Sequence, residues 1–145
     1  TYGRDGVINY SEWSVPLGRR FRALKIWFLL RAYGLEHLRA MIRDHVRWSE
    51  DLARKLAAEP GFEIVTQPML SLFTFRHAPG PGLDGDAHNL ALLQRINDDG
   101  RIYLTQTKVD GRLAIRFQAG QFEMREADAE TAFEVITSLA KEIAG

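Results

Sequence analysis

A cationic and apolar run over residues 14–34 constrains this chain more than any other stretch. It opens with Pro16 and Gly18, which interrupt regular structure, and then carries four cations within seven residues. Bulky side chains follow at spacings of three and four, the period of an amphipathic helix, and they are Phe21, Leu24, Trp27, Phe28 and Tyr33. Gly34 is placed to end that helix. The run therefore predicts a docking helix with one broad apolar face buried.

The composition describes one ordinary domain. The chain has 145 residues, of which 46% are hydrophobic and 26% are charged, and this is enough to bury a core. Nineteen basic and nineteen acidic side chains cancel, so no overall field favours nucleic acid or an anionic membrane surface. We expect neither as a partner. The chain has no cysteine, which excludes disulfides and thiolate ligands and fits a reducing cytoplasm, the expected location.

The sequence has neither the pattern of a membrane-spanning helix nor that of a secretion signal. The apolar segment 24–30 is too short to cross a bilayer, and no signal-peptide pattern opens the chain. The first residue is Thr1 and not methionine. We therefore expect a chain that has been excised from a longer protein.

A long helix is predicted over residues 35–58, because one seam of side chains recurs at threes and fours. The seam consists of Leu35, Leu38, Ile42, His45, Ser49, Leu52 and Leu56. We expect His45 to be a hydrogen-bonded core histidine, since no second histidine or carboxylate shares its face at the spacing of a metal site. No metal site is predicted anywhere in the chain.

Four segments are rich in branched and aromatic residues or alternate in polarity, as strands do, and they are residues 62–66, 70–77, 102–108 and 112–118. The first two flank Gln67 and Pro68, which we expect to form their turn. Asp110 and Gly111 lie between the last two and are the pair that tight hairpin turns favour. The sequence therefore predicts a mainly antiparallel sheet.

Two more helices complete the pattern. Asp86 can cap a helix that ends at Gly100, and a last helix is expected near Asp128. The glycines of the loop over residues 78–85 do not have the spacing of a nucleotide-binding loop. We predict an α+β fold in which helices cover the small sheet chiefly on one face. Residues 1–14 are expected to be a linker or mobile arm, and residues 15–145 the folded domain.

The residues by themselves contain no complete catalytic set, because there is no serine–histidine–acid group, no metal cluster and no phosphate loop. Tyr2, Tyr10 and Lys25 are candidate acids or amines, but their settings favour ring packing and a surface position. The arginines at positions 19, 20 and 22 fit a hinge held to another domain better than a nucleic-acid patch, since phenylalanine and an apolar run accompany them.

The stretch over residues 15–28, VPLGRRFRALKIWF, followed by RAYG at 31–34, closely resembles the start of the C-terminal domain of pyridoxal-phosphate-dependent group II decarboxylases, especially the aromatic-L-amino-acid decarboxylases. Similar segments follow in order, namely IRDHV at 42–46, FEI at 62–64, LLQRIN at 92–97 and IRF at 115–117. The resemblance covers nearly the whole chain. It implies the small C-terminal domain of a fold-type I enzyme, a cytoplasmic homodimer that uses pyridoxal phosphate to decarboxylate an aromatic L-amino acid.

The same resemblance implies that this chain is inactive alone. In the family the cofactor lysine follows a histidine, and none of the lysines here does so: Lys25, Lys55, Lys108 and Lys141. The family's aspartate motif for the pyridine nitrogen and its phosphate-binding residues are also missing. The resemblance thus implies no catalytic or cofactor-binding residue within the chain, and it implies the missing large domain and a second subunit as partners.

The resemblance carries three substrate-binding residues onto this chain. Leu17 and Gly18 match a Leu-Gly pair that, in the family dimer, approaches the substrate side chain bound in the neighbouring subunit. Histidine decarboxylases tend to carry serine at the position of Gly18, so glycine favours tyrosine, dopa or tryptophan. Arg116 matches the arginine that enzymes of this fold type often place near the substrate carboxylate, and its alternative role is a structural salt bridge.

Two alternatives stay open. The chain can be a self-contained, non-catalytic α+β module that binds a protein or regulates one. It can also belong to an aromatic aldehyde synthase of the same family, because the loop tyrosine that separates the two activities would lie upstream of Thr1.

Overall fold

The computed structural model describes residues 21–144, which fall into two units divided after Leu38. Leu17 and Gly18 therefore lie outside the described residues, as does the expected arm over residues 1–14. In chain order the elements are α1 (Ala23–Tyr33), α2 (Leu35–Ala58), β1 (Phe62–Met69), β2 (Leu72–His77), α3 (Gly85–Asp99), β3 (Thr105–Val109), β4 (Arg112–Gln118) and α4 (Glu126–Ala144). The predicted α+β class and the predicted order of elements are confirmed.

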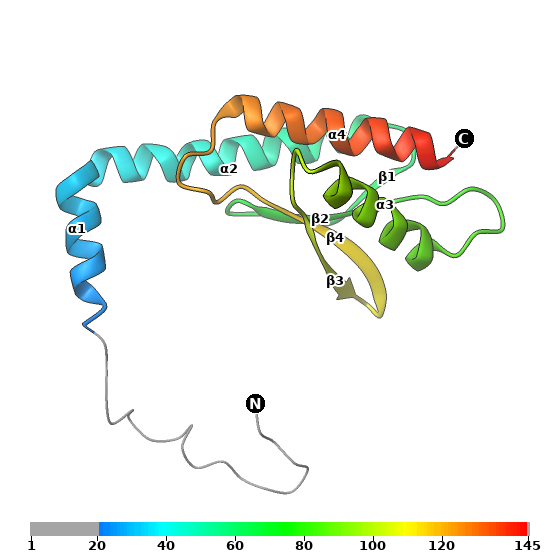
Figure 1. The fold of residues 1–145 in the computed structure, drawn as a ribbon, viewed down its shortest axis with the longest axis horizontal. Coiled ribbons are helices and arrows are strands. Elements are labelled where there is room, and N and C mark those ends of the chain that lie inside the picture. The colour runs from blue at the N-terminus through cyan, green and yellow to red at the C-terminus, as the bar shows by residue number, and fades with distance from the viewer. Residues whose placement is uncertain (1–20, 145) are drawn as a thin grey trace, which may run out of the picture. The chain divides into compact units, whose positions relative to one another are not determined.

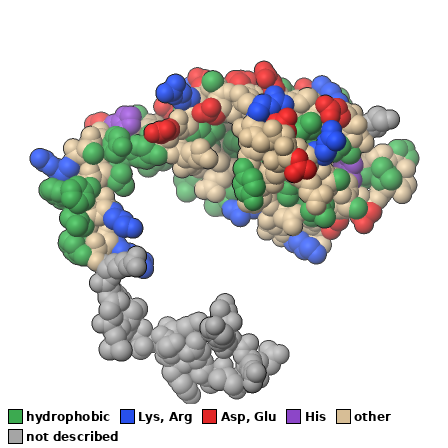
Figure 2. Space-filling view, viewed as in Figure 1, with side chains coloured by type: hydrophobic (Ala, Val, Ile, Leu, Met, Phe, Trp, Pro, Cys, Tyr) green, Lys and Arg blue, Asp and Glu red, His purple; other side chains and the backbone are tan. Residues whose placement is uncertain are grey.

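Helix α1, in the first unit, exposes all of its side chains. Trp27 is 54% exposed and Phe28 57%, although their rings pack edge to face with centroids 5.1 Å apart. Figure 2 shows the hydrophobic side chains gathered along this helix. The helix ends at Gly34, as predicted, where the backbone N–H donates to the carbonyl of Leu30. The predicted burial of its apolar face does not occur against any described residue.

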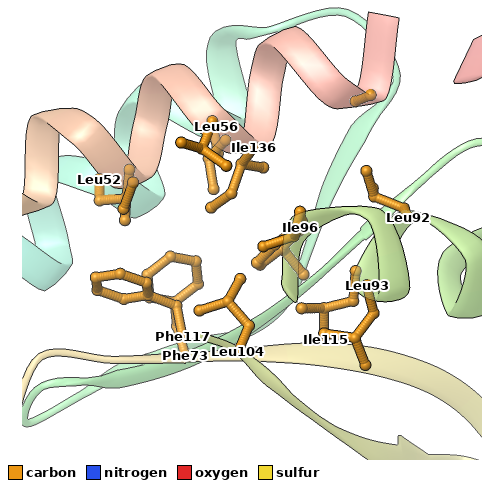
Figure 3. Packing of buried hydrophobic residues seen from close by; sticks show 14 of the residues in the cluster. Leu52, Leu56, Phe73, Leu92, Leu93, Ile96, Leu104, Ile115, Phe117 and Ile136 are labelled. Carbon is orange, nitrogen blue, oxygen red and sulfur yellow. The ribbon is translucent and has the colours of Figure 1, made fainter. Parts of the chain in front are cut away.

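The second unit is built on one four-stranded sheet of order β1-β2-β4-β3, in which every neighbouring pair is antiparallel. Helices α2, α3 and α4 lie on the same face of this sheet (Figure 1). Figure 3 shows the core between them, to which every one of these layers contributes: Leu52, Leu56, Phe73, Ile96, Ile115, Phe117 and Ile136. Each such side chain contributes roughly 1.5–3 kcal/mol through its burial. The predicted coverage of one sheet face is confirmed.

The turn between β1 and β2 lies two to three residues later than predicted. Leu70 and Ser71 form the turn, with Leu70 at φ 53°, and Pro68 lies inside β1. Proline is tolerated there because β1 is an edge strand with register irregularities on both sides of Thr66. The hairpin between β3 and β4 turns where predicted, with positive φ at Asp110 and Gly111 as a tight hairpin turn requires.

Helix α3 is capped by Asp84, and the prediction that Asp86 is the cap is wrong. The Asp84 carboxylate accepts a hydrogen bond from the backbone N–H of Asp86 at 2.9 Å. The side chain of Asp86 is directed elsewhere, because its Oδ1 accepts from the backbone N–H of Leu113 on β4. Asp86 thus ties the first turn of α3 to the sheet.

The predicted seam of α2 is buried from His45 onward, whereas Leu35 and Ile42 are exposed. His45 is buried as predicted, but its Nε2 has no hydrogen-bond partner among the described residues, so the prediction of a hydrogen-bonded histidine is wrong at that atom. The Nε1 of Trp48 and the Oγ of Ser49 are unpartnered in the same way. Polar atoms that lose water without gaining a partner oppose folding, by about 1–3 kcal/mol each.

We expect Ser49→Ala to raise the free energy of unfolding by about 1 kcal/mol, because it removes an unsatisfied hydroxyl and adds the best helix former. Chemical denaturation of the chain measures this. Ser138→Ala in α4 is the control, since that hydroxyl donates to the carbonyl of Val135, and its effect is expected to stay within about 0.5 kcal/mol. A loss of stability of more than about 1 kcal/mol for Ser49→Ala would show that its hydroxyl has a partner.

Candidate functional site

Arg116 is the one predicted site residue that lies within the described residues. On β4 it pairs with Thr74 of β2 and with Thr105 of β3. Its neighbours Ile115 and Phe117 point into the core, so the alternation of a strand places Arg116 on the opposite sheet face, which we call the open face. The structure therefore brings this guanidinium to the side of the sheet that α2, α3 and α4 leave uncovered.

The surroundings of Arg116 are polar. Across the strand, the Thr74 hydroxyl lies 2.9 Å from that of Thr66, which also accepts from the Thr74 backbone N–H. Arg116 is half-buried, and no carboxylate among the described residues lies within 4.0 Å of its guanidinium. The structural salt bridge considered from the sequence is thus not formed among these residues.

A second polar cluster lies where β2 and β4 separate, and the sequence did not indicate it. Their pairing ends at Phe75 and Ile115, so the next residue of β2, Arg76, has no ladder partner on β4. The Arg76 guanidinium instead donates from Nε to the Leu113 carbonyl at 2.6 Å. Its Nη2 donates to the carbonyls of Arg112 at 3.0 Å and Val109 at 3.1 Å. A buried arginine therefore stands in for missing backbone N–H groups.

Asn89 of α3 satisfies the backbone at the end of β2. Its Oδ1 accepts from the His77 N–H at 2.8 Å, and its Nδ2 donates to the carbonyls of His77 and Gly85. The side chain acts as a short strand partner, because a primary amide carries both a donor and an acceptor. Helix α3 is thereby fixed to the sheet through one buried residue.

His77 and His88 form a buried pair beside Asn89. His77 Nδ1 lies 2.9 Å from His88 Nε2, and the two rings are stacked. Burial, and secondarily the proximity of His88, lower the pKa of His77 below its ordinary value, so this site favours the neutral form of His77. Gly61 makes room for the pair, since a Cβ there would lie 2.8 Å from His77 Nε2. These histidines come from separate elements, and only the fold brings them together.

A cavity of about 390 Å³ opens against this cluster, and we call it the junction cavity. Its polar lining comes from β1, β2, α3 and β4 and comprises Glu63, Arg76, His77, Asp86, Asn89 and Arg112. Within residues 21–144 no three metal-ligating side chains are grouped to hold a metal ion. Among the helices of the same range, none combines the length and apolar character that crossing a bilayer requires.

The four lysines do not fit the amine that would bind pyridoxal phosphate. Lys25 and Lys108 are exposed, Lys55 pairs with Glu130, and Lys141 lies 3.7 Å from Glu59. None of them lines the junction cavity.

Comparison with known proteins supplies a family. The model of the pyridoxal-dependent decarboxylase conserved domain matches residues 3–78. Tyrosine decarboxylase 2 of Arabidopsis thaliana is 39% identical over 138 residues, which cover 92% of this chain and 25% of that protein. Phenylacetaldehyde synthase of the same plant is 33% identical over 132 residues, which cover 90% of this chain and 27% of that protein.

Among solved structures, that of Oryza sativa TDC with PLP and tryptamine superposes with a TM-score of 0.82 at 31% identity, covering 90% of this chain and 29% of that one. The chain thus spans roughly a quarter of the length of the relatives it matches. The chain belongs to the pyridoxal-dependent decarboxylase family, as the resemblance at residues 15–28 implied.

Proposed function

We propose that this chain is the C-terminal domain of a pyridoxal-phosphate-dependent decarboxylase that acts on aromatic L-amino acids. The observation that carries the proposal is the superposition on Oryza sativa TDC, a structure that holds PLP and tryptamine. The identity to tyrosine decarboxylase 2 supports the same class of substrate.

The chain's own contribution would be to bind and orient the substrate. We propose that Leu17 and Gly18 wall the pocket of the aromatic ring, where the missing side chain of glycine leaves room. Arg116 would bind the substrate carboxylate, because its guanidinium has no carboxylate partner among the described residues. Stabilising that carboxylate equally before and during its expulsion lowers KM without raising kcat, so Arg116 serves orientation.

Pyridoxal phosphate would be held by residues outside this chain, since no lysine here fits the amine. The cofactor supplies an electron sink for carbanion chemistry when it is bound. The large domain that provides its lysine is the first proposed partner, and a second subunit in a homodimer is the other. The apolar face of α1 supports both, because the described residues leave it exposed. A cytoplasmic location is proposed from the cysteine-free composition.

An aromatic aldehyde synthase is the second candidate, and the identity to phenylacetaldehyde synthase supports it. Such an enzyme would use the same cofactor and the same ring pocket. The two activities differ in their products, so the assay below separates them. A self-contained module is less well supported, because the family match begins near the start of the chain and its relatives are about four times longer.

The proposal is tested by comparing the full-length protein that contains this chain with the chain alone. The full-length protein, supplied with pyridoxal phosphate, is expected to convert tyrosine, dopa or tryptophan to the amine and carbon dioxide. The chain alone is expected to show no turnover and no stoichiometric adduct at one specific lysine after borohydride treatment, because the lysine that binds the cofactor is proposed to lie outside it. Aldehyde, ammonia and hydrogen peroxide as products would establish the synthase, and a stoichiometric adduct in the chain would contradict the assignment.

Gly18→Ser in the full-length protein tests the ring pocket. An added side chain in a filled site costs about 1–3 kcal/mol, and a pocket discriminates one small group by roughly 10- to 200-fold. We therefore expect kcat/KM to fall by that order for tryptophan and dopa, while histidine turnover is spared or improved. Steady-state kinetics on the three amino acids measure this. A uniform loss on all three would mean that Gly18 matters for the backbone and not for the pocket.

A further inference from the structure

Arg76 is a buried cation without a counter-anion. It is 7% exposed, and no carboxylate among the described residues lies within 4.0 Å of its guanidinium. Its three hydrogen bonds go to backbone carbonyls, which carry only partial charges. Proteins normally pair buried charges, because taking an ion out of water without a partner is expensive. Arg76 therefore lacks the counter-anion that a buried arginine normally has.

One edge of the guanidinium is still available. An arginine has five N–H donors, and the hydrogen bonds of Arg76 engage Nε and Nη2. No hydrogen bond from residues 21–144 reaches Nη1, and Arg76 lines the junction cavity. The two N–H groups of Nη1 are thus the donors of Arg76 that remain for a ligand.

The other charges around the junction cavity leave room for an anion. Arg112 adds a second guanidinium, and its contact with Glu63 is weak because the atoms are 3.8 Å apart and both side chains are about 60% exposed. Asp86 also lines the cavity and keeps its negative charge, although its Oδ1 is held by the Leu113 N–H. His77 lies on the inner wall as a neutral group that can gain a proton.

We propose that the junction cavity is an anion-binding site centred on Arg76, which takes a carboxylate or phosphate group. A planar guanidinium presents its N–H donors in a geometry that suits both carboxylate and phosphate oxygens. Arg112 would bind the same anion from a second side. A volume of about 390 Å³ is at the small end of ligand pockets, so the ligand would be a small anion or the anionic end of a larger one. The site uses none of Leu17, Gly18 and Arg116, so it does not depend on the proposed function.

Anion binding and the protonation of His77 would be linked. A negative charge beside His77 favours its protonated form and raises its pKa, against the lowering effect of burial. The charged groups that line the cavity with this histidine are Arg76, Arg112, Glu63 and Asp86, and the first two would attract the anion. Affinity should therefore increase as pH falls below about 6.5, the ordinary histidine value, because the lowered pKa of His77 places its protonation in that range.

The test is a titration of the 145-residue chain with inorganic phosphate and, separately, with succinate, followed by NMR. Sodium chloride holds the ionic strength constant and serves as the non-specific anion. We expect saturable shifts at the amides of Arg76, His77 and Asn89, together with a raised pKa of His77. The anion whose shifts saturate at the lower concentration, phosphate or succinate, identifies phosphate or carboxylate as the preferred group.

Arg112→Gln is expected to weaken binding by about two- to fivefold, the range of a partly exposed ion pair. Arg101→Gln is the matched control, because Arg101 is exposed and paired with Asp99 away from the cavity, and it should leave the affinity unchanged. Arg76→Gln should abolish binding, and the Arg112 variant keeps the test decisive if Arg76→Gln fails to fold. Shifts that do not saturate, that chloride reproduces, or that Arg112→Gln leaves unchanged would overturn the proposal.

Discussion

Burial of one face of the antiparallel sheet is the constraint on which the rest of the structure depends. Phe73 on β2 and Ile115 and Phe117 on β4 point toward α2, α3 and α4, and together they form the core. Because strand side chains alternate, the same register places Thr74 and Arg116 on the open face. The position of the candidate substrate arginine is therefore a consequence of packing. A slip of one residue would bury Arg116 and expose the core.

The end of the sheet shows how polar side chains complete what the strands leave unfinished. Beyond Phe75 the ladder between β2 and β4 stops, and Arg76 and Asn89 take over its hydrogen bonds. Satisfying buried backbone groups in this way requires charged and amide side chains in an otherwise apolar interior. Those same side chains line a cavity, so the structural solution also creates a place with the chemistry to bind a ligand.

Local patterns were sufficient to predict most of the fold and little of the site. The period of α2 and the Asp110-Gly111 turn are local signals, and both were predicted at the correct residues. The turn predicted at Pro68 was wrong, because a strand tolerates proline when it lies at the edge of the sheet, and the edge position of β1 is a property of the whole sheet. His77 and His88 are eleven residues apart in sequence, on β2 and α3, and their contact is tertiary, so no spacing in the sequence reveals it. The proposed roles of Leu17 and Gly18 depend on the family resemblance alone, because both residues lie outside the described residues.

The central claim is that the chain is one part of a larger enzyme, and that another part of this enzyme covers the exposed apolar face of α1. Sedimentation velocity of the 145-residue chain over a range of concentrations tests it most directly. An uncovered apolar face predicts self-association that rises with concentration and is lost in the double variant Trp27→Glu, Phe28→Glu, whose core remains folded. A monomer at every concentration, with the variant unchanged, would contradict the claim.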